Sequence, residues 1–521
     1  MKKILACILI TVLFLTGCSV PVEQKSEGIQ INLSDEKITV DGSKITNDTT
    51  QDVYSANDIV FYLAGQDFTY GEGTKEDEHQ QSEADAHTVV HITKPGKYVL
   101  SGKLSAGQIA VDLGEDAKEN PEAVVTLILN GIDITCTVAP AFIFYNVYEC
   151  SVADEETATK DVDTKNAGAN IIVADNSENN INGSYVAKIY KSYELNEDGT
   201  EVVDSKKLHK YDAAVYSKKT MNVDGGENGS GILNIRAENE GLDTELHLTI
   251  NGGNINITSG NDGINTNEDN VSVTTINGGS LNILCDGKTG EGDGIDSNGW
   301  LVINGGTVIS QACATSGDAG IDSDLGIYIN GGNVIASGNM LDKIAGGKQT
   351  YAVFSFATRQ VGDSTYILKN TENEKIGEYS PTNDFTYLLV AGDQLVEGDY
   401  TFWQGDTQLC AYSNTNMENE KPMDDMQQPP ENMNGEQPEK PEDMENPPKN
   451  FGEMGNPPEM PNGMEIPDGE IPQIPNGERP ERPNGMGGMG MINGEASTTF
   501  TIIKGGNQFS NVSPVPTTIT E

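Results

Sequence analysis

Short stretches of alternating apolar and polar residues recur through the middle of the chain, each beside an Asn-Gly-Gly turn. Some stretches come before such a turn and others follow one: 246–250 (LHLTI), 301–303 (LVI) and 326–329 (GIYI) precede it, and 254–259 (NINITS), 280–285 (SLNILC) and 307–312 (TVISQA) follow it. Alternation with a period of two predicts strands that bury one face. We therefore predict an all-β fold.

The turns recur at a nearly constant spacing. Ile-Asn-Gly-Gly occurs with its asparagine at positions 251, 277, 304 and 330, and Asp224 marks a degenerate earlier copy. A second motif keeps the same phase, at Glu240-Gly-Leu-Asp243, Asp262-Gly-Ile-Asn265, Asp293-Gly-Ile-Asp296 and Ala319-Gly-Ile-Asp322. A period of about 26 residues is too short for a propeller blade, and one coil of a parallel β-helix fits it best.

Stacking of such coils turns each motif into a column. Equivalent residues would lie roughly 4.8 Å apart along the stack. Asn251, Asn277, Asn304 and Asn330 are then expected to form an amide ladder, with the following glycines supplying the positive φ of a sharp corner.

The chain resembles a family of bacterial extracellular carbohydrate-binding proteins that fold as calcium-containing right-handed parallel β-helices. The resemblance covers roughly 90–340 and is carried by 96–112 (GKYVLSGKLSAGQIAVD), 127–134 (LILNGIDI), 212–218 (DAAVYSK) and the two repeated motifs. It implies a right-handed helix akin to the β-helical pectate lyases, bound calcium, and binding of cellulose or pectic polysaccharide.

The predicted organisation places this β-helix at 56–345, with a charged insertion at 185–210. We expect a flexible tether at 19–55, a β cap at 346–416 and a final cap strand and tail at 496–521. The remaining segment, 417–495, holds 11 of the 14 methionines and 15 of the 22 prolines. Such a composition does not build a core, so we expect a disordered acidic loop.

The N-terminus reads as a processing signal. Lys2 and Lys3 precede an apolar run, and Leu15-Thr16-Gly17-Cys18 resembles a bacterial lipobox. It implies a signal peptide at 1–18 and a lipid on Cys18. The protein is then expected to be extracellular and to be held at the outer face of the cell membrane by that anchor alone. The alternative that stays open is a cleaved secretory signal with a chance cysteine. The five other mature cysteines, which include no Cys-x-x-Cys pair, are expected to be buried thiols.

The net charge excludes some classes of binding partner. A formal net charge of -48 argues against nucleic acid and against direct docking on anionic lipid. The expected partner is a polysaccharide of the cellulose or pectin type, and the protein is expected to be a monomer.

The acidic columns predict a calcium site. Adjacent carboxylates at the stacking distance would repel by about 3–4 kcal/mol at an effective dielectric of 20. A hard cation that takes six to eight oxygen ligands would relieve this repulsion. The predicted ligands are Asp262, Asp293, Asp296, Asp318 and Asp322. The alternative, that these are solvated turn acids, stays open.

Catalysis has weaker support in the sequence, and we expect a binding protein rather than an enzyme. In lyase-like relatives the second column often carries lysine, whereas here it holds acids and an asparagine. Lys218, Lys219 and Lys288 are the remaining candidates for a base, and Asp293 with Asp296 would be the pair of a glycosidase. A calcium-dependent pectate-type lyase and a structural surface adhesin remain the alternatives.

Sugar rings stack on exposed aromatic faces, and strand parity suggests where such faces lie. If Leu301 and Ile303 point inward, Trp300 points outward, and by the same count Tyr328 is outside. These two residues are the predicted carbohydrate-binding platform. The alternative is that a loop covers this face.

Overall fold

The computed structural model describes residues 28–57, 59, 81–184, 186–195, 202–211, 213–413 and 496–516. For 81, 186–195 and 202–210 it describes the backbone alone, without side chains. The chain divides into two units, and all of these residues belong to the unit made of Met1–Met417 and Gly494–Glu521. The predicted signal peptide, Cys18 and nearly all of 417–495 lie outside the described residues. No described helix has the length and apolar character needed to cross a membrane.

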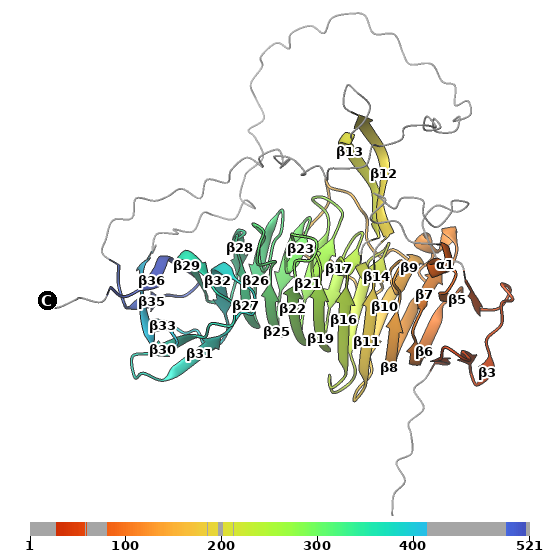
Figure 1. The fold of residues 1–521 in the computed structure, drawn as a ribbon, viewed down its shortest axis with the longest axis horizontal. Helices are drawn as coiled ribbons and strands as arrows, with labels where there is room; N and C mark the ends of the chain where they lie inside the picture. Colours follow the sequence, from red (N-terminus) through yellow and green to blue (C-terminus); the bar gives the residue numbers. More distant parts are fainter. Residues whose placement is uncertain are drawn as a thin grey trace, which may run out of the picture. The chain divides into compact units, whose positions relative to one another are not determined.

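The fold is all-β, and successive repeats stack as parallel strands in three rows (Figure 1). The first row pairs parallel throughout: β6 (Gly96–Leu104), β8 (Val125–Thr135), β10 (Ala169–Val173), β15 (Met221–Gly225), β18 (Leu248–Ile250), β21 (Val273–Ile276), β24 (Trp300–Ile303), β26 (Gly326–Ile329) and β28 (Ile344–Gly347).

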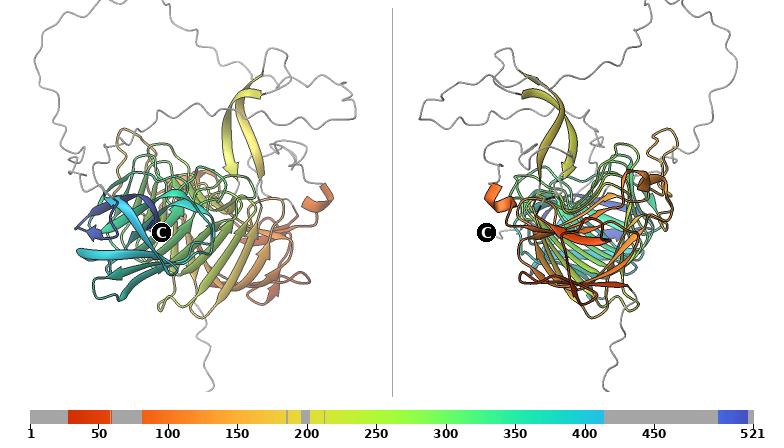
Figure 2. Two further views of the ribbon diagram at one scale, coloured as in Figure 1. Left: turned by 60° about the vertical axis from the view of Figure 1, so that its left-hand side comes forward. Right: turned by 90° about the vertical axis from the view of Figure 1, so that its right-hand side faces the viewer.

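The second row begins with the later halves of β6 and β8. It continues through β11 (Glu178–Gly183), β16 (Ile232–Ala237), β19 (Asn254–Ser259), β22 (Ser280–Cys285), β25 (Thr307–Gln311) and β27 (Asn333–Gly338). The third row forms a separate sheet of β5 (Thr88–Ile92), β7 (Gly107–Asp112), β9 (Phe142–Asn146), β14 (Ala213–Ser217), β17 (Glu240–Thr244), β20 (Ile264–Thr266) and β23 (Ile295–Ser297). In the end-on view the strands of successive repeats lie behind one another (Figure 2).

Apolar columns between the rows form the main core. One column follows the register of the first row through Leu127, Ile171, Val223, Ile250, Ile276, Ile303 and Ile329. Each of these side chains is at most 1% exposed. A single repeat has no partner for its apolar row, so burial comes only from its neighbours in the stack.

The predicted asparagine ladder is confirmed. Asn277 donates from Nδ2 to Asn251 Oδ1 at 2.8 Å, Asn304 to Asn277 at 2.9 Å, and Asn330 to Asn304 at 2.8 Å. The second glycine of each turn has a positive φ, as at Gly306 with 84°. The ladder therefore ties the corners of consecutive coils together.

Replacing Asn304 by alanine removes two bonds of this ladder at once. We expect a loss of about 1–2 kcal/mol in the free energy of unfolding, because each neutral hydrogen bond contributes roughly 1 kcal/mol. Asn330→Ala, at the end of the ladder, is the matched control and should lose about half as much. Equal losses in urea-unfolding measurements would mean that the second bond of Asn304 adds nothing to stability.

The N-terminal segment differs from the prediction. Residues 19–55 were expected to be a flexible tether, but β1 (Ile29–Leu33) pairs parallel with β6, and β4 (Val53–Ala56) pairs antiparallel with β5. Between them lie β2 (Thr39–Val40) and β3 (Ser43–Lys44). These strands extend the sheets because each short alternating run covers an otherwise open strand edge.

Two other segments complete the described unit. The region predicted as an insertion forms a hairpin of β12 (Val186–Leu195) and β13 (Val202–Tyr211). A helix, α1 (Gln81–Ala84), precedes β5, and a short 3₁₀ turn (Glu115–Glu119) follows β7.

Beyond the repeats, eight strands form a second core. They are β29 (Tyr351–Gln360), β30 (Tyr366–Asn370), β31 (Lys375–Tyr379), β32 (Phe385–Ala391), β33 (Gly398–Gln404), β34 (Thr407–Ser413), β35 (Phe500–Ile502) and β36 (Gly506–Pro514). β32 pairs antiparallel with β27, the last strand of the second row. Phe354, Phe402 and Phe509 stack inside, with 4.2 Å between the ring centroids of the first two. This region lies where the C-terminal cap was predicted.

Candidate functional site

The repeated acidic motif lies where the second row turns into the third. Its register follows the prediction, since Asp243 pairs with Asn265 and Asn265 with Asp296, and the Asp322 amide donates to Ile295 O at 2.7 Å. The motifs of consecutive repeats therefore form two columns.

Carboxylates in and beside the first column accept hydrogen bonds from backbone amides of a neighbouring coil. Asp262 Oδ1 accepts from the Asp293 amide at 2.7 Å, and Asp293 Oδ1 accepts from the Ala319 amide at 2.6 Å. Asp318 Oδ2 accepts from the Gly292 amide at 2.6 Å. These bonds to charged acceptors join coil to coil and give the recurring acids a structural role.

The second column is more deeply buried at its first two positions. Asp243 is fully buried and its Oδ1 accepts from Asn267 Nδ2 at 2.6 Å, while Asn265 Nδ2 donates to Glu240 Oε1 at 3.1 Å. Asn265 Oδ1 and Asn267 Oδ1 are buried oxygens that accept no hydrogen bond from a described residue. Buried oxygens in this state cost free energy unless a donor or a cation reaches them.

Acids crowd together towards the last coils. Burial, followed by the carboxylates of Asp322 and Asp296, raises the pKa of Asp293 well above its usual range. Burial and the Asp322 carboxylate raise the pKa of Asp342 to about 6. Asp342 was missed by the sequence analysis because it follows the last repeat and belongs to no motif.

The structure does not assemble the five predicted carboxylates around one point. Across the described ranges, no group of three or more His, Cys, Asp or Glu side chains is placed to hold a metal ion. An ion at these columns would therefore take part of its shell from amide and backbone oxygens. Asp243 and Asn265 are buried, and the buried Oδ1 atoms of Asn265 and Asn267 are such amide oxygens; the repeated motifs did not point to this set.

The three lysines considered as candidate catalytic bases lie in two different environments. Lys218 and Lys219 are about half-buried, and burial lowers the pKa of both side chains. Lys218 Nζ lies 4.3 Å from the centroid of the Tyr145 ring. Lys288 instead forms an ion pair with Asp286 at 3.0 Å.

The predicted aromatic face lies on the first row. Val273 pairs with Trp300 and Val302 with Tyr328, as the parity argument expected, and both rings are partly exposed. A loop between β9 and β10 also reaches this face. Thr164 Oγ1 bonds Thr249 Oγ1 at 2.7 Å, and Lys160 Nζ lies 5.3 Å from the Tyr328 ring centroid.

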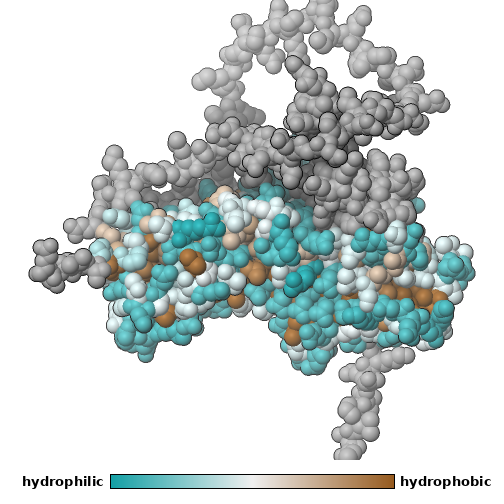
Figure 3. Space-filling model, viewed as in Figure 1, coloured by the Kyte–Doolittle hydropathy of each residue, from teal (hydrophilic) through white to brown (hydrophobic). Residues whose placement is uncertain are grey.

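The loop thus covers part of the proposed platform. Val302, which lies two residues after Trp300 on β24 and pairs with Tyr328, is only 5% exposed. Figure 3 shows one face of the molecule, which is mostly hydrophilic with apolar residues scattered over it. Scattered apolar residues are ordinary on a protein surface, so hydropathy alone selects no binding patch there.

The carbohydrate-binding domain-containing protein of Acetivibrio thermocellus is 29% identical over 258 residues, which are 49% of this chain and 64% of that protein. The chain thus matches slightly less than two thirds of that relative. A solved polysaccharide lyase-like protein from C. thermocellum has a TM-score of 0.31 and 19% identity, over 61% of this chain and 98% of that one.

A family profile described as carbohydrate-binding domain-containing protein matches residues 86–352, slightly more than half of the chain. The match runs from the start of the third row through the last repeat and into the first strand of the cap. The chain belongs to the family of carbohydrate-binding domain-containing proteins.

Proposed function

We propose that this protein is a cell-surface lipoprotein that binds polysaccharide of the cellulose or pectin type through a calcium-stabilised, right-handed parallel β-helix. The observation that carries the proposal is the family match, which spans the stacked repeats. Three rows of parallel strands in matching register support the helix, because a coil that repeats every 26 or so residues is the simplest path through them.

Retention on insoluble glycans tests the binding. The full chain is incubated with microcrystalline cellulose and with insoluble pectin, and the bound fraction is measured in calcium and in chelator. Retention on either glycan is the expected result. A protein that stays in the supernatant with both would favour the structural adhesin.

A calcium-dependent polysaccharide lyase is the second candidate function. The half-buried lysines Lys218 and Lys219 favour it, because burial lowers the pKa of a lysine and makes the neutral base more accessible. Incubation with polygalacturonate and calcium, followed by ultraviolet detection of unsaturated product, decides between the two. Formation of product would overturn a role limited to binding.

Calcium fits the chemistry of the buried column. Ca²⁺ takes oxygen ligands from carboxylates, amides and backbone carbonyls. Asp243 and the amide oxygens of Asn265 and Asn267 would hold it at the early coils. At the later coils, two of Asp293, Asp296 and Asp322 would share it with backbone oxygens, and Asp262 and Asp318 are bound to amides beside them. The ion would supply charge neutralisation among acids that otherwise raise one another's pKa.

Removal of calcium should lower stability. At a calcium concentration about 100 times the dissociation constant, binding to the folded state alone contributes about 2.7 kcal/mol. A thermal melt in chelator should therefore show a lower midpoint than one in calcium, with magnesium restoring less. Asp243→Asn should shrink this difference, whereas Asp363→Asn, an exposed turn residue of the cap, should leave it unchanged. Identical midpoints with and without chelator would overturn structural calcium.

The lipid anchor has its own test. Cys18 lies outside the described residues, and the proposal for it rests on the Leu-Thr-Gly-Cys sequence. Cells expressing the full chain should incorporate labelled fatty acid into the protein, and Cys18→Ser should remove the label. A labelled Cys18→Ser variant would place the lipid elsewhere.

A further inference from the structure

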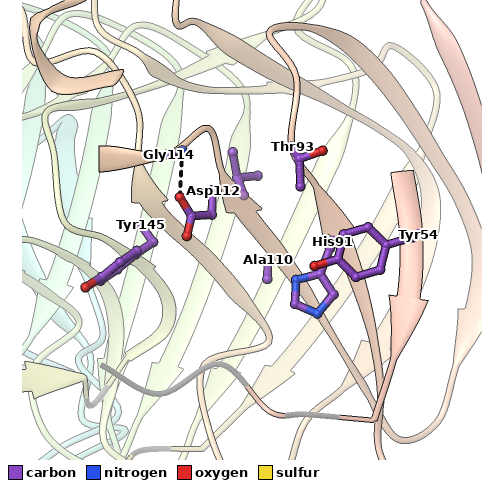
Figure 4. Close-up of a pocket in the computed structure, with 8 residues that line it drawn as sticks. Tyr54, His91, Thr93, Ala110, Asp112, Gly114 and Tyr145 are labelled. Carbon is purple, nitrogen blue, oxygen red and sulfur yellow. Dashed lines mark hydrogen bonds between the residues drawn. The ribbon is translucent and has the colours of Figure 1, made fainter. Parts of the chain in front are cut away.

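A second surface offers a better-formed place for a sugar than the predicted platform. A cavity of about 310 Å³ lies at the N-terminal end of the third row, over β4, β5, β7 and β9 (Figure 4). Its volume is at the lower end of the range for small-molecule sites, roughly 300–1,000 Å³. The residues that shape it are Tyr54, His91, Thr93, Ala110, Asp112 and Tyr145.

Aromatic rings stand on both sides of this groove. Tyr54 and His91 are directly paired across β4 and β5, and their rings stack in parallel, with centroids 4.5 Å apart and 9° between the planes. Since His91 is only 7% exposed, Tyr54 provides most of the accessible ring surface on that side. Tyr145 stands on the other side, where the ammonium of Lys218 lies over its ring.

The floor between the rings is low because of one small side chain. Ala110 pairs with His91 on one neighbouring strand and with Ile143 on the other. A larger residue at this position would fill the space between Tyr54 and Tyr145. Strands spaced about 4.8 Å apart put β4, which carries Tyr54, and β9, which carries Tyr145, roughly 14 Å from each other, which is room for one or two pyranose rings.

Asp112 supplies a fixed acceptor at one end of the groove. Its Oδ1 accepts from the Gly114 amide at 2.9 Å and from Asn146 Nδ2 at 2.8 Å. These two donors hold the carboxylate in place and leave Oδ2 as an acceptor for a ligand hydroxyl. Thr93, in the same lining, adds a hydroxyl group.

The charge of the groove favours a neutral ligand. Asp112 is its ionisable acid, and the whole chain carries a formal net charge of -48. The ammonium of Lys218, which lies over the Tyr145 ring, interacts with both Asp112 and Glu245, so it brings little uncompensated positive charge. A uronate chain would meet net repulsion here, whereas neutral sugar hydroxyls can donate to a carboxylate.

We propose that the groove between Tyr54 and Tyr145 binds one or two residues of a neutral polysaccharide, with the sugar faces on the tyrosines and a hydroxyl donating to Asp112. This site deepens the proposed carbohydrate-binding function and rests on it. It differs from the predicted platform of Trp300 and Tyr328, which lies on another row.

Titration of the full chain with cellohexaose, xylohexaose and hexagalacturonate tests the site by calorimetry. Tyr54→Ala and Tyr145→Ala should each weaken binding of a neutral hexasaccharide at least ten-fold. Tyr54→Phe and Tyr145→Phe keep the ring faces and should bind within about two-fold of wild type. Trp403→Ala, at a partly exposed aromatic residue of the C-terminal cap, is the control that should retain affinity. Trp300→Ala and Tyr328→Ala test the competing platform on the first row, and thermal melts confirm that every variant folds.

The outcomes separate the site from the wider function. If wild type binds and only the first-row variants lose affinity, the groove is overturned while carbohydrate binding stands. Binding of hexagalacturonate alone would overturn the assignment to neutral sugar. Absence of binding to all three oligosaccharides, together with no retention on insoluble glycans, would overturn both the groove and the proposed function.

Discussion

Replacing Gly294 by alanine is expected to destabilise the protein by about 3 kcal/mol, the upper end of the usual cost of overpacking. This glycine is the centre of the Asp293-Gly-Ile-Asp296 motif. An added Cβ would run into Ser310 Oγ and the carbonyl oxygen of Gly320 in the next coil. The carbonyl belongs to the backbone of the stack, so it has little freedom to move away.

Gly317→Ala is the matched control for this substitution. It changes a glycine three residues before Gly320, at a position where an added Cβ meets no atom within 4 Å. Chemical unfolding followed by circular dichroism should show a much lower midpoint for Gly294→Ala and a midpoint near wild type for Gly317→Ala. Similar midpoints for both variants would mean that the motif glycine is not required for close stacking of the coils.

The two repeated motifs show how much of the structure the sequence could predict. The spacing of the Asn-Gly-Gly turns was enough to place Asn251, Asn277, Asn304 and Asn330 in one ladder, because register in a repeating stack follows from the period. Nothing in the sequence assigned a packing role to the glycine of the acidic motif, whose acids alone were considered. Its contact with the next coil involves a carbonyl about 26 residues away, which a single motif does not reveal.

Long-range packing accounts for most of what the sequence did not show. β1 and β4 are short alternating runs whose partners, β6 and β5, lie some 35–70 residues later in the chain. A polar composition suggested a tether, and nothing local identified those partners. As a result, Tyr54 was placed in a linker, although it lines the cavity over β4, β5, β7 and β9.

The sequence predicted that the acids form columns, but it did not predict their hydrogen-bond partners. Their register could be read from the period, whereas the amide bonds accepted by Asp262, Asp293 and Asp318 depend on how each turn closes. The loop that brings Lys160 to Tyr328 is a further case, because its course over the first row is set by contacts such as Thr164 with Thr249.

Acidification should destabilise the protein through His247. This side chain is 2% exposed, and burial lowers its pKa to about 4, from about 6.5 for an unperturbed histidine. Its Nδ1 accepts from the Val273 amide at 3.0 Å, so the neutral ring carries its proton on Nε2, which donates to Ser151 Oγ at 3.1 Å. A second proton on Nδ1 would break the bond to Val273.

The direction of the pH effect follows from the two pKa values. The unfolded chain takes up a proton on His247 below about pH 6.5, whereas the folded protein takes it up only near pH 4. The stability contributed by the neutral ring is therefore complete above pH 6.5 and falls by roughly 3 kcal/mol as the pH drops to about 4.

His247→Asn isolates this contribution from that of the many carboxylates. Asparagine keeps an oxygen that can accept from the Val273 amide, but it does not titrate. The variant is expected to be less stable than wild type at pH 7.5, because it fills the buried site less well, and this gap should narrow steadily between pH 6.5 and 4. Urea unfolding at a series of pH values measures the gap. A difference in stability that stays constant across this range would show that His247 has the same pKa in the folded and unfolded states. Burial of the His247 ring against Ser151 would then have no effect on its protonation.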